Sequence, residues 1–250
     1  MKMMYLKLSL SSLALAICLT TTLQGQTLLN VKIGQTTLNG GVDGVYQEIA
    51  AAVLGSGNSW WNEYTYVSTT PFQVPVVDSG DSAIAGVTLT VSNSGGTGTK
   101  STAGTNPGFL FGSMPYQNAG GVFTISLTGL AANTRYEFVG YAARTSSSAG
   151  ASWAVTTGTL NSGATLNDGT SMDITTGVGK SYSAFFATTD GSGNLTVTDS
   201  GNPGTSITVL AGFQLQAVPV PEPSTVSLAG LGLLAGGLLL RRQTARSRNG

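Results

Sequence analysis

The fold class is decided by residues 123–143, FTISLTGLAANTRYEFVGYAA. Residues 123–127 alternate apolar and polar side chains, and residues 135–143 alternate again after a break that contains glycine. A period of two is the pattern of a β-strand with one buried face, and glycine suits the tight turn between two such strands. The stretch therefore predicts two neighbouring strands. In the second, Tyr136 and Phe138 share one face, opposite Glu137 and Val139.

The same pattern recurs on both sides of this stretch. Glycine-rich breaks such as 94–98 and 190–193 separate short runs and suit turns that need positive φ. Together the runs predict about nine strands, at residues 28–33, 64–67, 87–91, 123–127, 135–143, 152–157, 181–188, 194–198 and 205–216. Only residues 44–57, around 48–54, read as a short helix. Closely spaced strands without long helical crossovers predict an all-β fold, a single β-sandwich spanning residues 26–217.

The composition suits such a domain. Hydrophobic residues make up 41% of the 250 residues and charged residues only 9%, with 35 glycines and no histidine. Disordered chains are usually highly charged and poor in aromatic residues, whereas Trp, Tyr and Phe are spread along this chain. Between residues 26 and 217, five basic residues stand against ten acidic ones, a net charge of −5. This charge argues against nucleic acid as a partner.

The amino terminus has the three parts of a secretory signal peptide. Lys2 and Lys7 precede an apolar run at 8–19, and a polar segment of mostly small residues follows. The run is shorter than the roughly 20 residues that span a bilayer, so we expect a signal peptide at 1–25, cleaved near Gln26. An uncleaved anchor is the alternative. The one cysteine, Cys18, is an alternative lipid-acceptor site, although the preceding residue is the bulky Ile17.

The carboxyl terminus also has three parts. Residues 218–225 are rich in proline, residues 226–240 are uncharged and predict a transmembrane helix, and the tail 241–250 is basic. As a helix, 224–240 would rise roughly 25 Å, slightly less than a hydrocarbon core of about 30 Å. The basic tail favours a cytoplasmic end, which agrees with a translocated amino-terminal domain. A plain single-pass anchor is the alternative reading.

In this order the three parts resemble the PEP-CTERM sorting signal of Gram-negative bacteria. The motif is Val220, Pro221, Glu222, Pro223 and Ser224, and the basic stop is Arg241 and Arg242. The resemblance implies recognition by an exosortase-type membrane protease-transpeptidase, removal of the helix, and delivery to the cell surface, outer membrane or extracellular matrix. Proteins with this signal are typical of bacteria that make exopolysaccharide. The motif residues would be substrate and would catalyse nothing.

Two further resemblances concern the domain. Residues 129–139, GLAANTRYEFV, resemble the tyrosine-corner segment of fibronectin-like and jelly-roll sandwiches, in which the hydroxyl of the Tyr ties a loop to the adjoining strand. The order of an early Trp61-Asn62, the run 77–80 before a strand, and a closing strand at 210–215 is similar to carbohydrate-binding-module-like domains. It implies a jelly-roll sandwich, with a fibronectin-like one as the alternative.

Catalytic chemistry has few candidates between the two signals. Without His and Cys, neither a Ser/His/Asp nor a Cys/His arrangement exists, and the residues that zinc sites usually use are missing. A glycosidase would need two of Glu48, Glu63 and Glu137 to face each other. Runs 168–173 and 78–81 have oxygen-rich spacing for calcium, but Asp-Gly turns explain both. We therefore expect no enzyme, metal or cofactor, and keep a glycoside-active enzyme as an alternative.

The densest aromatic cluster contains Trp60, Trp61, Asn62 and Tyr64. Flat aromatic rings beside Asn could stack on a sugar, whereas strand alternation would place at least one Trp in the core. Two hypotheses follow. The leading one is an exported, non-enzymatic surface or matrix protein with a structural or adhesive role. The alternative is a carbohydrate-binding module that recognises exopolysaccharide through this cluster.

Overall fold

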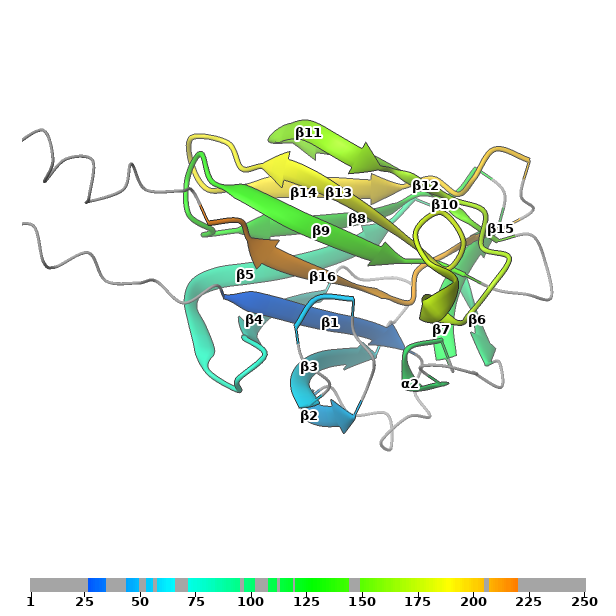
Figure 1. Cartoon of the computed structure of the whole chain (residues 1–250), viewed down its shortest axis with the longest axis horizontal. Helices are drawn as coiled ribbons and strands as arrows, with labels where there is room; N and C mark the ends of the chain where they lie inside the picture. Colours follow the sequence, from blue (N-terminus) through cyan, green and yellow to red (C-terminus); the bar gives the residue numbers. More distant parts are fainter. Residues whose placement is uncertain are drawn as a thin grey trace, which may run out of the picture. The chain divides into compact units, whose positions relative to one another are not determined.

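Strands make up most of the chain that the structure describes, and nearly all of them pair antiparallel (Figure 1). The computed structural model describes residues 27–34, 44–49, 53–55, 58–65, 72–94, 97–101, 108–111, 113–118, 120–143, 149–204 and 207–219. Contacts delimit a first compact unit, Gln26–Val218. The description below concerns the first unit.

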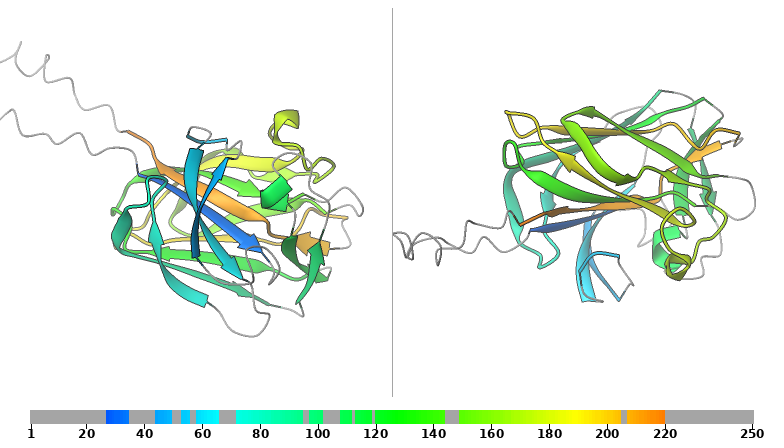
Figure 2. Two further views of the ribbon diagram at one scale, coloured as in Figure 1. Left: turned by 90° about the horizontal axis from the view of Figure 1, so that it is seen from below. Right: turned by 45° about the horizontal axis from the view of Figure 1, so that its top comes forward.

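The larger sheet has seven strands in the order β11-β13-β9-β16-β1-β3-β2. Their bounds are Thr159–Ala164 (β11), Tyr182–Thr188 (β13), Arg135–Tyr141 (β9), Gly212–Ala217 (β16), Leu28–Gly34 (β1), Asn58–Thr65 (β3) and Gly44–Ile49 (β2). The first and last of the described strands, β1 and β16, lie side by side near the middle of this sheet (Figure 2). Only the β1–β3 pair is parallel among the described strand pairs.

The second sheet has six strands in the order β12-β10-β14-β8-β5-β4. Their bounds are Leu166–Asn167 (β12), Ala151–Thr157 (β10), Leu195–Asp199 (β14), Phe123–Thr128 (β8), Ala83–Asn93 (β5) and Phe72–Val77 (β4). A third sheet contains β15 (Ile207–Val209), β7 (Ser113–Asn118) and β6 (Thr97–Ser101). Two single turns of helix complete the described elements, α2 (Gly108–Phe111) and the 3₁₀ turn Ile174–Thr176.

The core lies between the two large sheets. Phe138 of β9 is fully buried, with its ring centroid 4.9 Å from that of Phe185, 5.4 Å from that of Phe213 and 5.4 Å from that of Trp153. Trp153 belongs to β10, so this contact joins the sheets. Gly140 makes room for it, because a Cβ at that position would lie 2.4 Å from the indole. The buried residues of the alternating runs 123–127 and 135–143 belong to this core, as the sequence pattern predicts.

The expected all-β sandwich is confirmed, with more strands than the nine predicted. All nine predicted runs contain strand residues, and 205–216 contains two strands, β15 and β16. The finer choice between a jelly-roll and a fibronectin-like topology stays a prediction. Among the described residues no helix is long and apolar enough to cross a membrane. The signal peptide at 1–25 and the transmembrane helix at 226–240 lie outside these residues.

The predicted helix at 44–57 is wrong. Its first part forms strand β2, which pairs with β3 over six consecutive residues, and residues 53–55 form a bend. A short run of helix-forming residues loses to strand pairing when a neighbouring edge is available, since isolated short helices are marginal. Strand β4 was not predicted because it contains Pro75. A strand at the edge of a sheet tolerates proline, and among the described strands β4 pairs with β5 alone.

Candidate functional site

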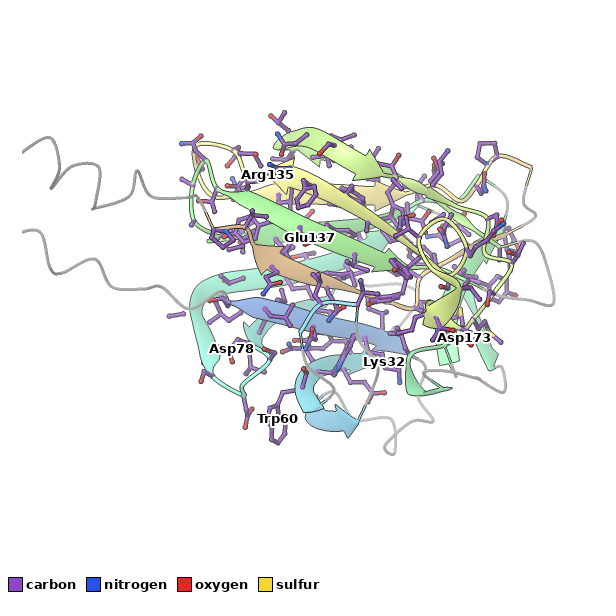
Figure 3. The ribbon with its side chains drawn as sticks, viewed as in Figure 1. Lys32, Trp60, Asp78, Arg135, Glu137 and Asp173 are labelled. Carbon is purple, nitrogen blue, oxygen red and sulfur yellow. The ribbon has the colours of Figure 1, made fainter. Side chains whose placement is uncertain are left out.

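The aromatic cluster lies on β3, and its side chains are mostly inside the protein. Trp61 is 1% exposed, Asn62 is fully buried and Tyr64 is 5% exposed, whereas Trp60 is half-buried (Figure 3). Of these four predicted carbohydrate-binding residues, only Trp60 keeps an appreciable exposed surface. The structure therefore gives the cluster a mainly packing environment.

Asn62 joins the two large sheets. Its side-chain nitrogen donates to the carbonyl oxygen of Asn30 on β1 at 2.9 Å and to that of Val77 on β4 at 2.8 Å. Its oxygen accepts from the amide of Val77 at 2.9 Å and from the hydroxyl of Tyr64 at 3.3 Å. An amide side chain has two donor hydrogens and two acceptor positions, so all of them are used. Asn62 is thus a structural clamp between sheets.

A buried ion pair lies beside this clamp. The ammonium of Lys32 on β1 is 2.7 Å from the carboxylate of Glu63 on β3, and the side chains are 2% and 7% exposed. The parallel register of β1 and β3 places these two residues opposite each other. Charges this far from water persist only when they are paired and hydrogen-bonded. The pair thus fixes the register of the one parallel contact.

Gln214 of β16 is the centre of a second buried network. Its side-chain nitrogen donates to the side chain of Asn30 at 2.7 Å and to the carbonyl of Leu54 at 3.0 Å. Its oxygen accepts from the amide of Leu54 at 3.0 Å and from the hydroxyl of Tyr141 at 2.6 Å. The amide of Val53 donates to that hydroxyl at 3.2 Å. Burial raises the pKa of Tyr141, so the hydroxyl remains a donor at neutral pH.

This network explains why residues 53–55 lie on the sheet without regular structure. The backbone of Leu54 pairs with the Gln214 side chain in both directions, as it would with a neighbouring strand. Gln214, Asn30 and Tyr141 are fully buried. Sequence reasoning missed the network because its members come from residues 30, 54, 141 and 214.

The three glutamates of the enzyme hypothesis have different surroundings. Glu63 is committed to Lys32. Glu137 lies on β9 opposite Phe186 and is half-buried (Figure 3). Glu48 lies on β2, opposite Ser59 of β3. Glu63 is thus already used by an ion pair, and the side chain of Glu48 lies outside the described residues, so the enzyme hypothesis stays a prediction.

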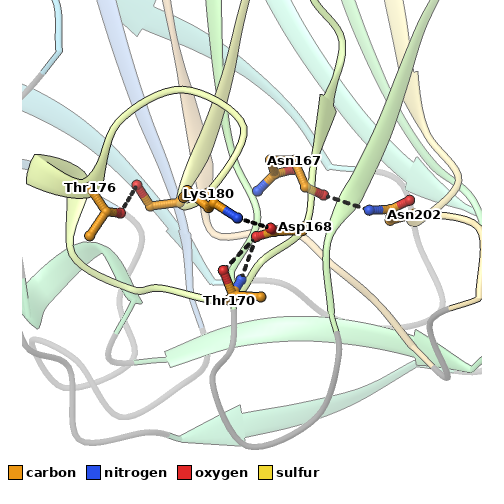
Figure 4. Close-up of polar contacts among 7 residues, drawn as sticks. Asn167, Asp168, Thr170, Thr176, Lys180 and Asn202 are labelled. Atoms are coloured by element: carbon orange, nitrogen blue, oxygen red, sulfur yellow. Dashed lines mark hydrogen bonds and ion pairs between the residues drawn. The ribbon is translucent and has the colours of Figure 1, made fainter.

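The two calcium hypotheses fall on turns whose carboxylates are already bonded. Asp168 accepts from Lys180 and from both the amide and the hydroxyl of Thr170 (Figure 4). Burial raises the pKa of Asp168, but the hydrogen bonds from Lys180 and Thr170 outweigh it and bring the pKa to about 2. Asp78 accepts from the amides of Gly80 and Ser82. Within the described residues no three acidic side chains form a metal-binding group.

Asp173, the other end of the predicted calcium run, caps a turn of helix. Its carboxylate accepts from the amide of Thr175 at 2.9 Å and from the hydroxyl of the same residue at 2.8 Å. Asx side chains commonly stabilise the first turn of a helix in this way. The Asp-Gly and capping turns therefore account for the oxygen-rich spacing.

The tyrosine-corner hydrogen bond is present. The hydroxyl of Tyr136 accepts from the amide of Ala131 at 3.2 Å, five residues upstream, and so ties the loop after β8 to the start of β9. Thr189 holds the other side of this loop, since its hydroxyl donates to the carbonyl of Ala131 at 2.7 Å. The contact predicted from residues 129–139 is thereby observed.

Asp199 at the end of β14 was not singled out from the sequence. It is fully buried, and burial raises its pKa to about 7, although the amides of Gly201 and Ser152 donate to one oxygen. The second oxygen has no hydrogen-bond partner in the part of the chain that the structure describes. The alternation Leu195-Thr-Val-Thr-Asp199 places Asp199 on the buried face with Leu195 and Val197, and that signal was available.

The sorting motif begins where the described unit ends. β16 finishes at Ala217, the amide of Val218 donates to the carbonyl of Arg135 at 2.9 Å, and Pro219 is exposed. Val220 to Ser224 and the basic stop, Arg241 and Arg242, lie outside the described residues. The chain thus consists of a β-sandwich followed directly, after its last described strand, by a carboxyl-terminal segment. This is the arrangement of a folded domain with a terminal sorting signal.

Comparison with known families identifies the class of this carboxyl-terminal segment. Residues 219–243 match the PEP-CTERM protein-sorting motif, a family that covers 25 of the 250 residues. The match supports export of the chain and its processing by an exosortase-type membrane enzyme. No curated protein and no solved structure matches the chain.

Proposed function

We propose that this chain is a non-enzymatic protein of the bacterial surface or extracellular matrix, delivered by an exosortase-type protease-transpeptidase. The observation that carries the proposal is the sorting motif at 219–243, which begins two residues after the last strand. Cleavage near the motif would separate the membrane-directed segment from a sandwich that keeps every described strand. The domain would then stand at the cell surface or outside it.

A structural or adhesive role is supported by how the domain uses its polar groups. The charge of Glu63 is balanced by Lys32. The side-chain amides of Asn62 and Gln214 form hydrogen bonds with backbone and side-chain groups inside the protein. Such networks favour a single rigid arrangement of strands. Carbohydrate binding by the aromatic cluster is less favoured, because Trp61, Asn62 and Tyr64 are buried and Trp60 alone of the four is partly exposed.

The proposal is tested by the intact mass of the protein in each cell fraction of its native host. We expect a chain that begins near Gln26, ends near the motif and is found at the surface or in the medium. Glu222→Ala should leave Arg248 in place and hold the chain in the inner membrane. The control is Glu137→Ala, the same substitution at a half-buried glutamate of β9 outside the motif, and this variant should be processed normally. A wild-type chain that keeps Arg248 at the surface would overturn the proposal.

A further inference from the structure

The outer face of the six-stranded sheet carries hydroxyl groups in place of charges. In β5 the side chains of Val87, Leu89 and Val91 are buried, so the residues between them face outward. β8 alternates in the same way. Between Val87 and Asn93 of β5, and along β8, the outward residues are all Thr or Ser: Thr88, Thr90, Ser92, Thr124, Ser126 and Thr128. The first part of β5 exposes Ala83, Ala85 and Gly86 instead.

The two strands on the β14 side extend the pattern. Thr196 and Thr198 face outward from β14, between the buried Leu195, Val197 and Asp199. β10 contributes Ser152 and Thr156, with Ala154 between them. Of the outward positions on residues 87–93 of β5 and on β8, β14 and β10, ten of eleven therefore bear a hydroxyl. We call these ten residues the hydroxyl face.

Strand register arranges the hydroxyl face in rows. Thr90 lies opposite Ser126, which lies opposite Thr196 on its other side. The hydroxyls of Ser126 and Thr196 are 3.3 Å apart. In antiparallel sheets neighbouring strands are about 4.8 Å apart, and successive residues on one face are about 6.8 Å apart. The face is thus a regular grid of groups that each donate and accept hydrogen bonds.

The absence of charge selects the kind of partner. None of the eleven outward positions holds an acidic or basic residue, although the span 26–217 contains fifteen charged side chains (ten acidic and five basic). A charged polymer would find no opposite charge here. Protein partners usually bury aromatic or Arg anchors, and these positions hold none. A neutral polymer with many hydroxyls matches the face group for group.

We propose that the hydroxyl face binds a neutral polysaccharide. Each Thr or Ser hydroxyl would exchange hydrogen bonds with sugar hydroxyls, and the Thr methyl groups would contact the apolar faces of the rings. Single contacts of this type are weak, and repetition along a polymer supplies the affinity. The inference rests on the proposed function, since an exposed domain at a surface or in a matrix is where such a polymer is met.

The test is co-sedimentation of the full chain, in mild nonionic detergent, with particles of cross-linked dextran and of cellulose, and with carboxymethyl-cellulose as the charged counterpart. We expect binding to at least one neutral polymer that exceeds binding to carboxymethyl-cellulose. The double variant Thr90→Val with Thr124→Val keeps the shape and strand preference of both side chains but removes two hydroxyls. Its affinity for the neutral polymer should fall by about fivefold or more. The matched control is Thr159→Val with Thr188→Val, which lie opposite each other on β11 and β13 of the seven-stranded sheet, and should bind like the wild type.

Three results would overturn the inference: no binding to either neutral polymer, stronger binding to carboxymethyl-cellulose, or equal loss in both double variants. Circular dichroism of each variant shows whether its fold is kept. Because the purified chain is used, a failure here leaves cellular processing untouched. Failure of processing, in turn, appears in the masses of the cell fractions and leaves this binding result intact.

Discussion

The side-chain nitrogen of Gln214 donates to the side-chain oxygen of Asn30 at 2.7 Å, which joins the last strand of the domain to the first across 184 residues of sequence. The same amide holds the backbone of Leu54 against the sheet through two further bonds. One buried residue therefore connects three parts of the chain that are far apart in sequence.

Replacing Gln214 by Leu should destabilise the domain strongly. The change keeps a similar volume but leaves the buried amide of Leu54 and the side chain of Asn30 without this partner, at a cost of about 3 kcal/mol or more. Urea unfolding followed by tryptophan fluorescence measures it. Gln216→Leu, on the same face of the same strand but half-buried, is the control and should cost less than about 1 kcal/mol. Equal effects of the two variants would contradict the role of the network.

Removing one member of the Lys32–Glu63 pair should cost more than removing both. Lys32→Met takes the ammonium away from the buried carboxylate of Glu63, and breaking such a pair costs roughly 3–5 kcal/mol. The double variant Lys32→Met with Glu63→Leu should recover most of that loss, since the site becomes apolar. A double-mutant cycle in urea gives the coupling energy. Additive single effects would show that the two charges do not stabilise each other.

Asp199 should make the domain less stable as the pH rises. Its folded pKa of about 7 lies above that of an unfolded Asp, near 3.9, so the folded state holds the proton more tightly. The stabilisation is complete below about pH 4 and is lost as the pH rises through 7, a change of up to about 4 kcal/mol. Asp199→Asn should remove this dependence and be the more stable protein at pH 8.

The measurement is the free energy of unfolding at pH 4.5, 6 and 8 for both proteins. Asp168 acts in the opposite direction at lower pH, because its folded pKa of about 2 is depressed and its contribution disappears as the pH falls toward that value. Restricting the series to pH 4.5 and above separates the two groups. Parallel profiles for wild type and Asp199→Asn would show that Asp199 is ionised throughout.

Tyr136→Phe should lose the corner hydrogen bond and little else. The ring stays buried, while the amide of Ala131 loses its partner, which costs about 1 kcal/mol. Tyr182→Phe is the control, because Tyr182 is half-buried and lies on the neighbouring strand β13. Differential scanning calorimetry should give a lower Tm for Tyr136→Phe alone. A matching fall for Tyr182→Phe would mean that the corner contributes nothing specific.

The sequence predicts the parts of this fold that depend on local alternation. β8, β13 and β14 alternate buried and less buried residues along their length, and β9 does so over its first four residues; each strand was expected. β2 and β4 were not, since pairing with an available edge overrides a run of helix-forming residues in one case and a proline in the other.

Prediction of the site followed the same division. The Tyr136 contact spans five residues and was expected from the local motif. The roles of Asn62 and Gln214 were not expected, because their partners lie up to 184 residues away and no local pattern specifies them. From the sequence, Trp61 fits a sugar-stacking role as well as a core position. Its burial in the structure decides for the core.

The place of β16 between β1 and β9 has a consequence for how the chain becomes folded. During synthesis and export the amino terminus emerges first. β1 and β9 therefore cannot pair with β16 until the chain from Gly212 onward has been made. The domain therefore has high contact order in its central sheet, and contacts of this kind form slowly. Completion of the sheet and arrival of the segment that directly follows it are nearly the same event in time.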